Sequence, residues 1–112
     1  MLGATALAQE NSCVFLEQPQ LLNTFERPDQ NITVIGYAPE RPYALLITRD
    51  LEAQWPQVYA CVPDAFFSRS HLGRYINVGS FESRQQAEAV ARQLEEISSS
   101  GIRILHQRRL RR

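Results

Sequence analysis

Hydrophobic and polar positions alternate from Tyr75 to Val78, which predicts a β-strand. Within it, Ile76 and Val78 share one face, and Tyr75 and Asn77 share the other. The polar Asn77 in the middle of an otherwise apolar strand indicates that its face is turned away from the core. Gly79 follows, and its backbone freedom predicts a sharp turn at the end of the strand.

A helix is predicted after this turn. Ser83 and Gln86 have the S-x-x-Q spacing of a capping box. Apolar residues then recur with helical periodicity and form one inner stripe: Ala87, Val90, Ala91, Leu94 and Ile97. Alternation resumes from Ile102 to His106, which predicts a final strand with Arg103 on the face opposite its isoleucines.

The preceding part of the chain predicts the same order of strand, helix and strand. Tyr43 to Thr48 is a continuous apolar run ending in threonine and predicts a strand. Because Pro56 lacks a backbone N–H, we expect a turn over 51–54 and then a short helix with Pro56 in its first turn. Pro63 ends that helix, and Ala65 to Ser70 predicts the next strand.

The element order between Tyr43 and His106 is therefore β-α-β-β-α-β, the order of the ferredoxin-like α+β fold. The helices of such a unit cover one face of an antiparallel sheet and leave the other face open. The open face is expected to carry these side chains: Tyr43, Leu45, Tyr75, Asn77 and Arg103.

An N-terminal extension, residues 11–42, precedes this unit, which spans 43–107. Within the extension, Ile32 to Ala38 is rich in β-branched side chains and predicts one extra strand. That strand either pairs with an edge of the sheet or lies across its open face. Residues 108–112 form a basic tail that we expect to be solvated.

Residues 1–10 are mostly small and apolar, and an A-x-A triplet before Gln9 has the form of a signal-peptide cleavage site. They are either the end of a signal peptide that begins upstream or a disordered N-terminus. The first interpretation places the protein outside the cytoplasm, in the periplasm or cell envelope.

Cys13 and Cys61 are the only cysteines. They have neither C-x-x-C spacing nor a neighbouring histidine, so they do not predict a metal site. In an exported chain they would form a disulfide that closes a long loop. The alternative is two independent thiols, with Cys61 as a small core residue.

Composition excludes several functions. The chain has 112 residues with 12 basic and 12 acidic side chains, so its zero net charge does not favour nucleic-acid binding. No apolar run is long enough to span a bilayer. Ser80 follows a glycine, but the G-x-S-x-G motif of a nucleophilic serine is absent, and neither a cofactor nor an enzymatic activity is predicted.

The stretch RYINVGSFESRQQAEAVARQL, residues 74–94, resembles the SPOR (sporulation-related repeat) domain. The motif of that family is aromatic-x-V-Q-V-G-S-F, followed by a polar turn and a helix with an internal A-E. The matching positions are Tyr75, Val78, Gly79, Ser80, Phe81, Ala87, Glu88 and Leu94. Asn77 stands where the family usually has glutamine. The stretches VPDAF and LGRYI before it also look like those of cyanobacterial SPOR-like proteins, so the resemblance covers residues 43–106.

The resemblance implies a non-catalytic module that binds peptidoglycan, in particular glycan strands stripped of stem peptides, as found at bacterial division sites. The glycan would lie on the open sheet face. Tyr75 would stack on a sugar ring, Asn77 and Ser80 would bind polar groups, and Tyr43 would extend the surface. Arg69 or Arg103 would pair with a free lactyl carboxylate.

Two departures from the family pattern keep other interpretations open. In the first half-repeat, Leu45 occupies the position equivalent to Asn77, and Thr48 occupies the position equivalent to Ser80. Half of the polar pair is therefore lost there. The residues before Pro39 also lie outside the pattern. The alternatives are an ordinary solvated sheet face, a protein-interaction module that uses this face, and, on topology alone, an RNA-binding module, for which the basic and aromatic strand is missing.

Overall fold

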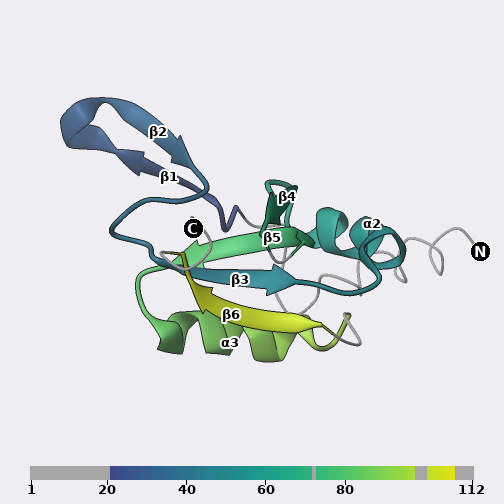
Figure 1. Cartoon of the computed structure of the whole chain (residues 1–112). Coiled ribbons are helices and arrows are strands. Elements are labelled where there is room, and N and C mark those ends of the chain that lie inside the picture. Colours follow the sequence, from purple (N-terminus) through teal and green to yellow (C-terminus); the bar gives the residue numbers. More distant parts are fainter. Residues whose placement is uncertain (1–20, 72, 98–100, 108–112) are drawn as a thin grey trace, which may run out of the picture.

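The computed structural model describes residues 21–71, 73–97 and 101–107. Its elements, in chain order, are β1 (Thr24–Arg27), a short 3-10 helix (Pro28–Gln30), β2 (Ile32–Ile35), β3 (Tyr43–Ile47), α2 (Leu51–Cys61), β4 (Phe66–Ser70), β5 (Gly73–Phe81), α3 (Arg84–Leu94) and β6 (Ile102–His106). Four strands form one antiparallel sheet in the order β4-β5-β3-β6, and β1 and β2 pair only with each other (Figure 1).

The predicted α+β class is confirmed, and the antiparallel sheet with two helices is compatible with a ferredoxin-like fold. Both helices contribute to one buried cluster on the same face of the sheet. It contains Leu45 and Ile47 of β3, Ile76 and Val78 of β5, Val58 and Cys61 of α2, and Ala91 and Leu94 of α3. Burial of these side chains is the main favourable term in the stability of the domain.

The predicted orientation of β3 is wrong. Leu45 is fully buried in the core under the helices, while Ala44 and Leu46 occupy the opposite face. Tyr43 alternates with Leu45 and therefore also belongs to the helix-covered face. A continuous apolar run has no alternation to read, so its orientation depends on the neighbouring strands.

The predicted start of α3 is confirmed. The side chain of Ser83 accepts the Gln86 backbone N–H at 3.2 Å, and the Gln86 side chain accepts the Ser83 N–H at 3.3 Å, as a capping box requires. Ala87, Ala91 and Leu94 are buried along the inner stripe, and Val90 and Ile97 pack against the same core. Because both signals are local in sequence, they could be recognised without the fold.

Helix α2 begins earlier than predicted and contains Pro56 inside it. Leu51, Gln54, Val58 and Cys61 form its buried side, whereas Pro56 is exposed. Gln54 strengthens the first turn, because its Nε2 donates to the Arg49 carbonyl at 2.7 Å. Burial of the inner side thus outweighs the cost of a proline within the helix.

Strand β5 continues through Gly79 to Phe81, so the sharp turn predicted at Gly79 is wrong. Instead, the register with β3 shifts here: Leu45 pairs with Gly79, but Leu46 pairs with Asn77, so Val78 is an extra residue. This β-bulge moves the following side chains to the other face. An ideal Cβ on Gly79 would lie 2.8 Å from Leu22 Cβ and 3.0 Å from Phe81 Cζ.

The N-terminal extension forms a hairpin rather than the single predicted strand over 32–38. Strand β2 ends at Ile35, and its partner β1, which the sequence analysis missed, pairs with it from Thr24↔Ile35 to Arg27↔Ile32. The hairpin extends away from the main sheet (Figure 1). Ile32 and Ile35 of β2 are apolar but exposed. The hydrophobic pattern of this segment therefore gives little indication of where each strand ends.

Several predictions concern residues outside the described ranges, namely 1–10, 108–112 and Cys13. Cys61 is buried and disulfide-bonded, but the pairing with Cys13 stays a prediction because Cys13 is not described. No helix among the described residues is long and apolar enough to cross a membrane.

We predict that Gly79→Ala lowers the free energy of unfolding by about 1–3 kcal/mol, since the added methyl overlaps Leu22 and Phe81. Chemical denaturation measures the loss. In a Leu22→Gly background, which removes the Leu22 Cβ, the cost of Gly79→Ala should fall. An equal cost in both backgrounds would show that Leu22 does not set the requirement for glycine.

Candidate functional site

The polar residues of β5 lie together on the sheet face away from the helices. Asn77 pairs with Leu46 and Ser80 pairs with Ala44, and both of these β3 residues belong to that face. The bulge explains how two residues three positions apart share a face. Neither side chain is open to solvent, however, because Asn77 is 3% exposed and Ser80 is 1% exposed.

The segment Leu22–Thr24, which we call the strap, is hydrogen-bonded to β5 at both residues. Its backbone N–H groups donate to the Asp64 carboxylate, from Leu22 at 3.1 Å and from Asn23 at 2.9 Å. The Thr24 hydroxyl donates to the same carboxylate at 2.7 Å. Asp64, in the loop between α2 and β4, thus holds the strap at the point where β4 no longer pairs with β5.

Asn23 is fully buried, and its side chain joins the strap to β5. Its Nδ2 donates to the carbonyls of Asn77 at 3.2 Å and Asp64 at 3.3 Å. Its Oδ1 accepts from the Ser80 hydroxyl at 3.4 Å, and the Ser80 backbone N–H donates to the Leu22 carbonyl at 3.1 Å. Gln107 completes the network by donating from Nε2 to the Ser80 hydroxyl oxygen at 3.2 Å.

Asn77 is less well satisfied than its neighbours. Its backbone carbonyl accepts from Asn23, but its side-chain Oδ1 is buried without a hydrogen-bond partner in the described part of the chain. A buried acceptor without a partner costs about 1–3 kcal/mol. The strap therefore fits the β5 polar pair incompletely.

Tyr75 lies on the predicted face but is packed rather than open. It is 8% exposed and forms a second cluster, the sheet-face cluster, with Ala44, Leu46 and Leu105. A shallow pocket of about 80 Å³ lies beside it, lined by Leu46, Thr48, Ser70, Gly73, Arg74, Tyr75 and Leu105. The face of the Tyr75 ring is thus largely taken up by this apolar packing.

The other predicted site residues divide between the two faces. Arg103 pairs with Leu46 and is exposed on the predicted face. Arg69 pairs with Arg74 and lies two positions from Phe67, whose ring packs on Trp55 of α2, so Arg69 belongs to the helix side. Tyr43 contacts His106 edge-on at the strand end. The structure therefore does not bring Tyr43, Arg69 and Arg103 together around Asn77.

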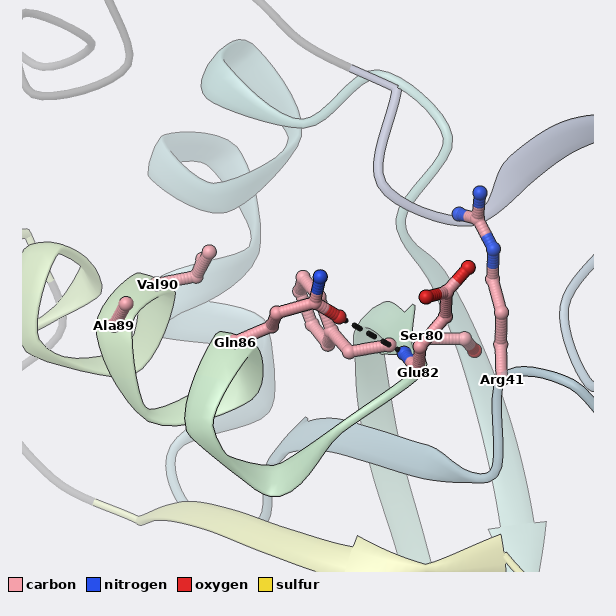
Figure 2. A pocket seen from close by; sticks show the side chains of 7 residues that line it. Arg41, Ser80, Glu82, Gln86, Ala89 and Val90 are labelled. Atoms are coloured by element: carbon pink, nitrogen blue, oxygen red, sulfur yellow. Dashed lines mark hydrogen bonds between the residues drawn. The ribbon is translucent and has the colours of Figure 1, made fainter.

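A larger groove lies at the start of α3. Its volume is about 410 Å³, and its lining, which defines the α3 groove, comprises Arg41, Ser80, Phe81, Glu82, Gln86, Ala89 and Val90. Figure 2 shows Gln86, Ala89 and Val90 on the helix, with Arg41 on the opposite wall. Gln86 Oε1 accepts the Glu82 backbone N–H at 3.1 Å, so the capping box also shapes the groove wall.

Arg41 is held in place by the N-terminal hairpin. Its guanidinium lies 4.0 Å from the centre of the Phe25 ring, a cation–π contact. Arg27 in β1 makes a bidentate pair with Glu40, with both N–O distances 2.7 Å. The hydrogen bond from Arg27 lowers the pKa of Glu40 below its usual range, so this carboxylate stays charged beside Arg41 at neutral pH.

The α3 groove combines groups that suit a polar ligand with apolar patches. Arg41 and Glu82 supply opposite charges, Gln86 an amide and Ser80 a hydroxyl, while Phe81 and Val90 supply apolar surface. Arg41, Glu82 and Gln86 were not predicted as site residues from the sequence. Only Gln86 had a signal, its capping spacing. No group of three or more His, Cys, Asp or Glu side chains within the described ranges could hold a metal ion.

No protein-family model, curated protein or solved structure matches this chain significantly. The likeness to the SPOR domain therefore stays a prediction from the motif around Asn77 and Ser80.

We predict that Asn23→Ala costs about 2–3 kcal/mol of unfolding free energy, because it removes hydrogen bonds to Asn77, Asp64 and Ser80. Asn77→Ala should cost less than about 1 kcal/mol, because deletion of an unpaired buried acceptor offsets the lost packing. Urea denaturation of both variants tests the order. A larger loss for Asn77→Ala would contradict the hydrogen-bond assignment.

Proposed function

We propose that this protein is a non-catalytic module of the bacterial cell envelope that binds glycan strands of peptidoglycan, in particular strands without stem peptides. The observation that carries the proposal is the α3 groove. Its volume of about 410 Å³ lies in the range of ligand-binding clefts, and several of its lining residues belong to the SPOR-like stretch. These are Ser80, Phe81, Glu82 and Gln86.

The groups of the groove match the chemistry of an amino-sugar polymer. Hydroxyl and acetamido groups need both donors and acceptors, which the exposed side chains of Gln86 and Glu82 supply. The apolar side of a sugar ring suits Phe81 and Val90. Arg41 adds a cation that is held by the Phe25 ring and is suited to the lactyl carboxylate of a strand without stem peptides.

This proposal moves the site from where the motif alone would place it. Asn77 and Ser80 are buried and hydrogen-bonded to Asn23, and Tyr75 is packed in the sheet-face cluster. The groove begins at Ser80 and continues toward α3. The glycan would contact the last residues of β5 from the side of α3, and Arg41 would form the opposite wall of the groove. An exported, periplasmic location and a role at division sites belong to the same proposal.

A second candidate function is docking of a protein on the sheet face. It is favoured by the shallow pocket of about 80 Å³ beside the sheet-face cluster, where the exposed Thr48 and Arg74 border the partly buried Leu105. Arg103 lies beside this cluster, next to Leu46. This alternative and the glycan proposal differ in the residues they require.

We predict that the protein co-sediments with purified peptidoglycan, and more strongly after an amidase has removed the stem peptides. Arg41→Ala and Gln86→Ala should each reduce the association constant about tenfold, as expected for loss of one strong polar contact. Arg92→Ala is the matched control, because Arg92 lies in the last turn of α3 and outside the groove.

Arg103→Ala separates two possible positions of the glycan, the α3 groove and the sheet face. It should leave glycan binding unchanged if the α3 groove is the site. Loss of binding in Arg103→Ala, with normal binding in Arg41→Ala, would place the glycan on the sheet face. If the wild-type protein sediments no more than an unrelated control protein at low salt, glycan binding is wrong and docking of a protein is the better candidate.

A further inference from the structure

The strap separates two parts of one polar surface. Ser80 belongs to both parts: it lines the α3 groove, and its hydroxyl donates to Asn23 under the strap. Asn77 lies on the same face as Ser80, beyond the strap contact. Opening of the strap would free the Ser80 hydroxyl, which lines the groove, and the Asn77 backbone carbonyl, because both are now bonded to Asn23.

The attachment of the strap is mainly polar and depends on one side chain. The Asp64 carboxylate accepts from Leu22, Asn23 and Thr24, and the remaining bonds to β5 come from Asn23 and the Leu22 carbonyl. Leu22 alone among the three packs against the hydrophobic core, and it is only partly buried. Loss of the Asp64 carboxylate would therefore loosen the whole strap.

The hairpin that follows the strap adds little apolar anchoring. Its strands make their main contacts with each other, and Ile32 and Ile35 are 44% and 67% exposed. Segments with few buried apolar contacts open at a lower free-energy cost than the core does. The strap can thus open while the four-stranded sheet stays folded.

The closed strap also leaves an unsatisfied group. Asn77 Oδ1 is buried without a hydrogen-bond partner among the described residues, whereas the backbone carbonyl of Asn77 accepts from Asn23. A ligand that brings a donor to this oxygen gains an interaction that the strap does not supply. The polar groups of β5 would therefore be better satisfied by a ligand that has one more hydrogen-bond donor than Asn23.

We infer that the strap is an autoinhibitory segment, and that Asn23 occupies the place of an acetamido group of the glycan. The carboxamide of Asn23 donates N–H to the Asn77 carbonyl and accepts the Ser80 hydroxyl. An acetamido group has the same donor and acceptor, and the neighbouring sugar hydroxyls can donate to Asn77 Oδ1. This inference rests on the proposed glycan-binding function and adds its regulation: the groove binds a short segment, and opening of the strap admits a longer one.

The apparent affinity for the extended site is the intrinsic affinity multiplied by the fraction of molecules with an open strap. Asp64→Ala removes all three contacts to the carboxylate and raises that fraction. Thr24→Val removes only the hydroxyl contact and is the milder variant if Asp64→Ala folds poorly. Asp29→Ala is the matched control, since Asp29 lies in the 3-10 helix of the hairpin.

The test measures binding of denuded glycan strands to the full chain, before and after chemical de-N-acetylation of the strands. We expect Asp64→Ala to raise the association constant about tenfold and Thr24→Val to raise it less, with no change in Asp29→Ala. De-N-acetylated strands should lose this gain, because they lack the group that replaces Asn23.

Hydrogen exchange provides a readout on the wild-type protein. Saturating denuded glycan should lower the protection of the Leu22 and Asn23 amides, which donate to Asp64, and leave the β3 amides protected. Unchanged or higher protection of the strap amides in the complex would overturn the inference.

The outcomes also separate the inference from the proposed function. Equal binding by wild type, Thr24→Val and Asp64→Ala overturns autoinhibition and leaves glycan binding at the groove intact. Binding by the two variants without binding by the wild type supports autoinhibition but rules out the groove as a sufficient site. No binding by any of the three proteins overturns both.

Discussion

The carboxylate of Asp64 is the interaction on which the arrangement of this protein depends. It accepts hydrogen bonds from two backbone amides and one hydroxyl of the strap, and so fixes the N-terminal extension to the sheet. Charge-assisted hydrogen bonds of this kind are among the stronger polar contacts in proteins. Through these bonds, the loop between α2 and β4 fixes the position of the strap on β5.

The β-bulge at Val78 is the second constraint. By adding one residue to β5, it places Asn77 and Ser80 on one face while Val78 and Phe81 remain with the core. Gly79 at this position has no room for a side chain, because Leu22 approaches closely. Gly79, the bulge and the strap thus form one structural unit, in which the close approach of Leu22 requires glycine at position 79.

This unit gives the SPOR-like motif a structural role beside its proposed binding role. Ser80 is a hydrogen-bond partner of both Asn23 and Gln107, and so joins the N-terminal extension to the end of β6. Phe81, Glu82 and Gln86 line the α3 groove, which the hairpin completes with Arg41. The residues of the motif are close together in the sequence, but in the structure some of them contact the strap and others line the α3 groove.

Local patterns in the sequence determined the element order from Tyr43 to His106, the capping box at Ser83 and the buried stripe of α3, because these signals involve residues within a few positions of each other. The face of β3, the bulge at Val78 and the burial of Asn77 were decided only by the tertiary structure. A continuous apolar run contains no alternation, a bulge is defined by the partner strand, and Asn77 is buried where it bonds a residue more than fifty positions away. Likewise, Arg41 and Gln86 meet in one groove only because β3, which begins just after Arg41, pairs with the end of β5, which precedes α3.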